Sequence, residues 1–114
     1  MSVTLYHNPR CSKSRQTLAL LEENNVSPSI VKYLETPPSV ETLKEIYAQL
    51  GLESVRGMMR VKEDVYKTLE LSNASDEELF SAMANNPKLI ERPIVIKDGK
   101  ARLGRPPEQV LEIL

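Results

Sequence analysis

A strand, a helix and a second strand follow one another at the start of the chain, and this order restricts the fold more than any other feature. Residues 3–7 alternate as a half-buried strand does. Residues 12–25 carry one broad apolar face, which predicts a helix, and residues 29–34 predict the second strand. A strand-helix-strand unit forms a parallel pair with a right-handed crossover.

The middle of the chain is helical in pattern. Ser39 is an N-cap and Gly51 a C-cap for a predicted helix over residues 40–50. Ser75 and Glu78 have capping-box spacing, which predicts a helix from about residue 76 to 85. Between these helices we expect two short helical turns, near residues 54–60 and 63–69.

The end of the chain predicts a hairpin and a helix. Asp98-Gly99 separates strand patterns at 94–97 and 100–103, and a helix is expected over 107–114. The predicted class is α/β, a thioredoxin-like mixed β-sheet flanked by helices, with a helical insert at about residues 39–89. With 114 residues we expect one domain, residues 1–114.

Composition excludes several classes of protein. Hydrophobic residues make up 40% and charged residues 27% of the chain, values ordinary for a globular protein. The net charge of -1 gives no general attraction to nucleic acid. No stretch approaches the roughly 20 apolar residues of a membrane span, and no secretory signal is present, so we expect a cytoplasmic protein. One cysteine permits neither an internal disulfide nor a thiolate-rich metal site.

That cysteine, Cys11, falls at the predicted N-terminus of the first helix, four residues after the only histidine, His7. A free thiol with a pKa near 8.5 is only about 3% ionised at pH 7, so a nucleophilic role requires a lower pKa. Helix N-terminal N–H groups and nearby cations lower it. Arg10, Lys13 and Arg15 are the expected cations, with His7 as a further candidate.

Ser14 stands three residues after Cys11, where a dithiol oxidoreductase carries its second cysteine. The site therefore has one thiol, and a redox cycle must take its second thiol from a partner. The simpler alternative for Cys11 is a small buried core residue, although the polar, cationic sequence RCSKSR argues against it. His7 has an equally simple alternative, a strand-end histidine satisfied by the backbone.

Several arginines form a second signal: Arg60, Arg92, Arg102 and Arg105. In a thioredoxin-like order, the start of the third strand, where Arg92 lies, faces the cysteine loop. Guanidinium groups there could form a fork for a tetrahedral oxyanion. For any single arginine, the alternative is a solvated surface side chain.

The chain resembles the glutaredoxin-coupled arsenate reductases, the ArsC family, over essentially its whole length. The resemblance rests on five motifs in the family's order: YHNPRCSKSR, YLETPPS, VRGMMR, LIERPIVI and RLGRPPEQVLEIL. It implies that Cys11 attacks arsenate to form a cysteinyl thioarsenate, and that Arg60, Arg92 and Arg105 hold the oxyanion. It also implies that glutathione, as co-substrate, attacks the adduct, that glutaredoxin resolves the mixed species, and that arsenite leaves. No metal or bound cofactor is implied, and we expect a monomer.

Three further residues match supporting positions of the family. His7 resembles a histidine that favours the thiolate, and Ser14 a hydroxyl near the sulfur. Pro93 resembles the cis-proline opposite the cysteine of thioredoxin-like folds, although an Arg-Pro bond is usually trans. Cys11 is followed by Ser12-Lys13, where resistance-type reductases carry a glycine, and the chain ends at Leu114 without their C-terminal extension. These features resemble a housekeeping branch of the family.

Two other functions remain open from the sequence. One is an Spx-like redox regulator that binds RNA polymerase, although Ser14 removes the Cys-x-x-Cys switch of many such proteins. The other is a glutaredoxin-like monothiol oxidoreductase, which would need Cys11 but neither Arg60 nor Arg105.

Overall fold

The computed structural model describes residues 2–114, which divide into two compact units. The first is formed by the chain up to Thr36 together with Arg92–Leu114, and the second by Pro37–Glu91. The second unit covers the segment in which the sequence places the helical insert. Within the described residues, no helix is both long enough and apolar enough to cross a membrane.

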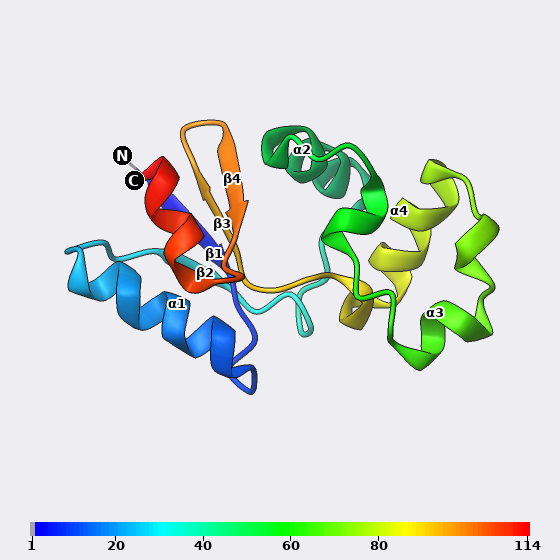
Figure 1. The fold of residues 1–114 in the computed structure, drawn as a ribbon, viewed down its shortest axis with the longest axis horizontal. Helices are drawn as coiled ribbons and strands as arrows, with labels where there is room; N and C mark the ends of the chain where they lie inside the picture. The colour runs from blue at the N-terminus through cyan, green and yellow to red at the C-terminus, as the bar shows by residue number, and fades with distance from the viewer. Residues whose placement is uncertain (1) are drawn as a thin grey trace. The chain divides into compact units, whose positions relative to one another are not determined.

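A mixed four-stranded sheet forms the centre of the first unit (Figure 1). Its strands are β1 (Val3–Tyr6), β2 (Ser29–Val31), β3 (Ile94–Lys97) and β4 (Lys100–Leu103). They lie in the order β2-β1-β3-β4, with β1 and β2 parallel and the other two pairs antiparallel. The predicted thioredoxin-like mixed sheet flanked by helices is therefore confirmed.

Two helical elements cover the same face of this sheet, namely α1 (Ser12–Glu23) and η4 (Pro107–Ile113), which pack against each other. Their shared core is made of Val3, Leu5, Leu21, Val95, Val110 and Ile113. The helix expected at the end of the chain is present, and it has the 3-10 form. Its buried residues are Pro107, Val110 and Ile113, and a turn of three residues aligns this spacing along one edge facing the core.

The second strand is shorter than expected, because β2 ends at Val31 rather than near residue 34. The Lys32 carbonyl accepts hydrogen bonds from the backbone N–H groups of Glu35 and Thr36, both at 2.9 Å, and so turns the chain out of the sheet. Tyr33 is buried by this turn, whereas Leu34 is 43% exposed. The turn lies beside the loop that follows β1, because the His7 N–H donates to the Val31 carbonyl at 2.9 Å.

The predicted hairpin joins β3 to β4. Asp98 and Gly99 have φ angles of 51° and 78°, the left-handed conformation that a tight two-residue hairpin turn requires at both positions. An Asp-Gly pair adopts it readily, and this is the reason that the sequence signal is reliable.

The second unit contains α2 (Val40–Leu50), η1 (Val55–Met58), α3 (Asp64–Thr68), η2 (Leu71–Asn73), α4 (Asp76–Asn85) and η3 (Pro87–Leu89). The predicted caps are present: Ser39 accepts from the Thr42 N–H at 3.2 Å, and Ser75 forms the full capping box. Gly51 ends α2 with a φ of 68°. The helices α2 and α4 pack together, with the rings of Tyr47 and Phe80 edge to face at 5.9 Å.

Gly104 occupies a position in the first unit where no side chain fits. A Cβ atom added there would lie 2.6 Å from Cγ of Pro93 and still closer to Oγ1 of Thr17 on α1. The Gly104 N–H also donates to the Pro93 carbonyl at 2.9 Å. The absence of a side chain therefore lets α1, the end of β4 and the start of β3 approach one another.

Gly104→Ala is expected to lower the free energy of unfolding by about 1–3 kcal/mol, the usual effect of overpacking a close contact. Urea unfolding followed by circular dichroism measures it. Gly57→Ala is the matched control, because its added Cβ would meet only side-chain atoms of Leu52, the nearest at 3.2 Å. Equal unfolding midpoints for the two variants would contradict the close packing at Gly104.

Candidate active site

Cys11 is the N-cap residue of α1 and only 8% of its surface is exposed. Its backbone has extended geometry, with φ -92° and ψ 124°, and its N–H donates to the Asn8 carbonyl at 3.0 Å. Its own carbonyl accepts the first helical hydrogen bond, from Arg15 N–H at 3.0 Å. The thiol therefore sits where the free N–H groups of the helix point.

The surroundings lower the pKa of the Cys11 thiol below its ordinary value. Burial is the largest single influence and raises the pKa. It is outweighed by the backbone N–H of Ser14, the charge of Arg92, the backbone N–H of Lys13 and the charge of Arg105, which all favour the thiolate. A helix N-terminus and two guanidinium groups thus act on one sulfur atom.

The sheet brings these two arginines to the cysteine. In the antiparallel pairing of β1 with β3, Tyr6 lies opposite Ile94, so the loop after β1 meets the residues just before β3. Arg92 is one of these, and its peptide bond to Pro93 is cis. Arg105 follows β4, and its Nε donates to the Arg92 carbonyl at 3.1 Å.

The Ser14 side chain is fully buried and organises the loop behind the thiol. Its Oγ lies 2.6 Å from Nδ1 of His7 and accepts from the Asn8 N–H at 3.0 Å. The backbone N–H of Ser14 favours the thiolate, and the hydroxyl near the sulfur that the resemblance implies stays a prediction. Asn8 is a further residue of this loop that was not among the candidate site residues, although an Asn before a proline is a common turn signal. Its Oδ1 accepts a hydrogen bond from the Arg10 N–H at 3.0 Å.

His7 does not act as a cation at neutral pH. Burial, and then the positive charges of Lys32 and Arg15, lower its pKa below the ordinary 6.5, so the ring is neutral. The His7 ring is held against the first turn of α1, because its Nδ1 lies 2.6 Å from the Ser14 Oγ, and its role beside the thiolate stays a prediction.

The other expected cations have different places. Lys13 acts on the thiol through its backbone N–H, while the Arg15 guanidinium donates to the Pro9 carbonyl at 2.9 Å. Arg102 is directed to η4, where its Nε lies 2.9 Å from Oε1 of Glu112.

Arg60 belongs to the second unit. Its Nη1 lies 3.2 Å from Oε1 of Glu63, and its backbone N–H donates to the Leu89 carbonyl at 2.7 Å. Its part in an anion site at Cys11 therefore stays a prediction.

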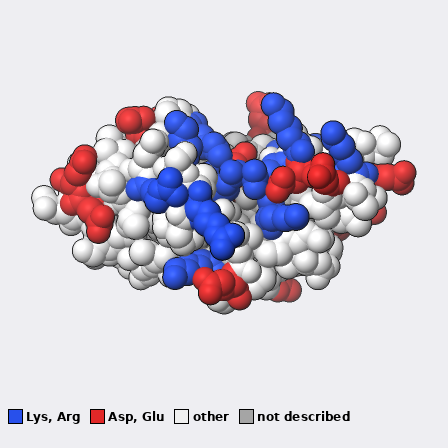
Figure 2. Space-filling view, turned by 90° about the horizontal axis from the view of Figure 1, so that it is seen from below, with Lys and Arg blue, Asp and Glu red and all other residues white. Residues whose placement is uncertain are grey.

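The charges on α1 run against the helix dipole. Its first turn carries Lys13 and no acidic residue, and its last turn carries Glu22 and Glu23 and no basic residue. Figure 2 shows lysine and arginine side chains gathered where this helix begins, with acidic side chains toward its other end. The arrangement opposes the usual stabilising pattern by roughly 0.3–1 kcal/mol per charge, but it leaves the N-terminus attractive to an anion.

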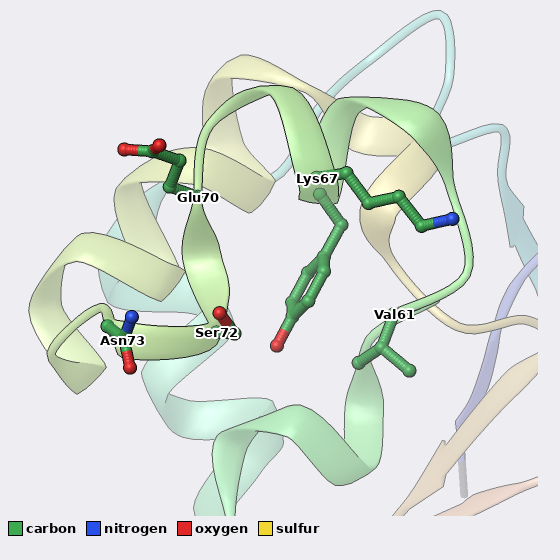
Figure 3. A pocket seen from close by; sticks show the side chains of 6 residues that line it. Val61, Lys67, Glu70, Ser72 and Asn73 are labelled. Carbon is green, nitrogen blue, oxygen red and sulfur yellow. The ribbon is translucent and has the colours of Figure 1, made fainter.

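A hollow of about 400 Å³ lies beside the cysteine loop, lined by residues 7–10 and by Lys32, Leu34 and Glu35. A larger one, of about 510 Å³, lies in the second unit, with Tyr66 in its wall. Figure 3 shows Glu70 on one side of it and Lys67 on the other. The larger hollow contains none of the residues that the sequence singled out. Among the residues described, no cluster of three potential metal ligands occurs.

The rate of Cys11 alkylation by iodoacetamide is expected to reach half its plateau at a pH below that of a free cysteine, because the thiolate is the reactive form. Arg92→Gln and Arg105→Gln should each raise this midpoint, since each removes a positive charge that favours the thiolate. Lys13→Gln keeps the backbone N–H and is the matched control, so its midpoint should stay in place. A midpoint at or above that of free cysteine would contradict the site.

Comparison with known proteins agrees with this geometry. A sequence profile described as the ArsC family matches residues 6–113. The chain is 60% identical to the uncharacterised protein YfgD of Escherichia coli K12, covering 98% of this chain and 96% of that one. It is 55% identical to an arsenate reductase of Haemophilus influenzae over the full length of both. The solved structure of an arsenate reductase from Vibrio cholerae superimposes with a TM-score of 0.98 at 66% identity, covering 100% of this chain and 98% of that one. A profile match over nearly the whole chain, with relatives this similar, shows that the chain belongs to the ArsC family.

Proposed function

We propose that this protein is an arsenate reductase that reduces arsenate to arsenite through Cys11, with glutathione and glutaredoxin as the source of electrons. The observation that carries the proposal is the thiol at the N-terminus of α1, whose pKa is lowered by backbone N–H groups and by Arg92 and Arg105. Relatives of more than half identity are named arsenate reductases, which supports the same substrate.

The same groups that favour a thiolate also suit a tetrahedral oxyanion. Guanidinium groups bind such anions through paired hydrogen bonds and neutralise their charge. In the proposed reaction, Arg92 and Arg105 hold the arsenate oxygens and Arg60 is the third arginine of the set. They also stabilise the charge that develops on those oxygens as the sulfur attacks.

The first step is a condensation. The Cys11 thiolate attacks arsenic, an arsenate oxygen takes up protons and leaves as water, and a sulfur–arsenic bond forms. Arsenic remains pentavalent in this adduct, so no electrons have yet been transferred.

Reduction requires a second thiol. Arsenate gains two electrons when two thiols become one disulfide, and this chain supplies only one thiol. A glutathione thiolate therefore attacks the Cys11 sulfur of the adduct. The sulfur–arsenic bond breaks, arsenic keeps the electron pair and leaves as arsenite, and Cys11 is left in a mixed disulfide with glutathione. Glutaredoxin reduces that disulfide, and the cycle calls on no metal or bound cofactor.

A coupled assay tests the proposal, with arsenate, glutathione, glutaredoxin, glutathione reductase and NADPH. Cys11→Ser should abolish arsenate-dependent NADPH oxidation, and Arg92→Ala should lower kcat/KM for arsenate by about 10²-fold, as expected for a donor that stabilises developing charge. Arg102→Ala is the matched control, because that guanidinium faces Glu112, and it should retain activity.

The outcome also separates this function from its competitors. No turnover by the intact protein, with a low Cys11 pKa confirmed, would overturn arsenate reduction in favour of another oxyanion or a regulatory partner. Glutathione-disulfide exchange that needs Cys11 but is unchanged by Arg105→Ala, in a protein without arsenate turnover, would indicate a glutaredoxin-like oxidoreductase.

A further inference from the structure

The hollow beside the cysteine loop has the size and position of a small-molecule site. Its volume of about 400 Å³ falls within the usual range for ligand sites, roughly 300–1,000 Å³. One wall is the loop after β1, residues 7–10, which leads directly into Cys11. The other wall is the turn after β2, formed by Lys32, Leu34 and Glu35.

This hollow and the two arginines lie on opposite sides of the cysteine loop. Strand β1 is paired with β2 along one edge and with β3 along the other. Lys32 follows directly after β2, whereas Arg92 comes just before β3. An anion held by Arg92 and Arg105 therefore approaches Cys11 from the β3 side, and the hollow opens on the β2 side.

The attack of a glutathione thiolate on Cys11 is consistent with an anion site on one side of the loop and a thiol site on the other. When a thiolate attacks a sulfur atom, the incoming and leaving groups lie on opposite sides of that atom. Arsenic leaves Cys11 toward the arginines, so we expect the incoming thiol on the side of the sulfur atom that faces away from them. The hollow reaches Arg10, the residue next to Cys11, and is large enough for the molecule that carries this thiol.

The charges around the hollow match those of glutathione. At neutral pH glutathione carries two carboxylates and one ammonium group. The hollow presents two exposed cations, Arg10 and Lys32, one exposed carboxylate, Glu35, and the half-exposed apolar side chain of Leu34. His7 also lines the hollow, and its lowered pKa adds no further charge.

We propose that this hollow is the binding site for glutathione, with Arg10 and Lys32 on its two carboxylates and Glu35 near its ammonium group. The proposal rests on the proposed function for the identity of the thiol, but the site itself can be tested without arsenate. Charge pairs at exposed positions are modest in strength, so each contact is expected to change rates severalfold rather than by orders of magnitude.

The test compares two disulfides in their reaction with Cys11. The Cys11 thiolate attacks oxidised glutathione, forms a mixed disulfide and releases one glutathione thiolate. It attacks bis(2-hydroxyethyl) disulfide, which has no charged groups, in the same way. Arg10→Ala and Lys32→Ala should each slow the reaction with oxidised glutathione about threefold and leave the reaction with the neutral disulfide unchanged. Lys100→Ala, an exposed lysine on β4 away from the hollow, is the matched control and should change neither rate.

Mass spectrometry of the mixed disulfide over time gives both rates. Rates with oxidised glutathione that are unchanged in the variants, or that fall equally with both disulfides, would overturn the site.

In the arsenate assay, Lys32→Ala should raise KM for glutathione and leave KM for arsenate unchanged. Arsenate turnover with no change in KM for glutathione would overturn the site and leave the proposed function standing. If the variants react more slowly with oxidised glutathione alone, and the intact protein does not turn over arsenate, the glutathione site is supported and the proposed arsenate reductase function is overturned.

Discussion

The antiparallel pairing of β1 with β3 is the constraint on which the cysteine site depends. It sets Tyr6 opposite Ile94, and the next residues on each side are then the cysteine loop and the Arg92-Pro93 segment. These two segments are more than 80 residues apart in the chain, and nothing local holds them together. Gly104 tightens the arrangement, because its missing side chain admits Thr17 and Pro93. The charge that favours the thiolate is therefore a product of the sheet.

The helix that begins at Cys11 shows a compromise between stability and electrostatics. Lys13 at its start and Glu22 and Glu23 at its end oppose the helix dipole, so α1 gives up the stabilisation that the reverse order would provide. An acidic residue in its first turn would compete with a bound anion for the same N–H groups. The helix is held instead by packing, since Leu21 lies in the shared core with Leu5 and Val95. Because packing stabilises α1, its first turn can carry a cation near the thiol and no acidic residue.

Features that depend on neighbouring residues could be read from the sequence directly, whereas features that depend on distant contacts were predicted only as far as the order of strands and helices indicates them. Caps at Ser39, Gly51 and Ser75 and the turn at Asp98-Gly99 are local, and all were predicted correctly. The early end of β2 and the 3-10 form of η4 are set by hydrogen bonding and packing in the folded unit. The cations next to Cys11 in the sequence were expected to act on its thiol, whereas Arg92 and Arg105 were expected near it only through the thioredoxin-like order and the family resemblance. The charges that act on the thiol are those of Arg92 and Arg105. Charge neighbours in space cannot be inferred from neighbours in sequence.

Ser14 shows why the single thiol of this protein is built into its structure. The position that could hold a second cysteine is fully buried, and its hydroxyl is bound to the His7 ring at 2.6 Å and to the Asn8 N–H at 3.0 Å. A sulfur atom there would be larger and a weaker hydrogen-bonding partner, so the loop would lose the contacts that shape it. A chain with one cysteine cannot close its own disulfide, so in the proposed cycle a mixed disulfide on Cys11 persists until another molecule reduces it. The time that Cys11 spends oxidised is then governed by the supply of reduced thiols around the protein.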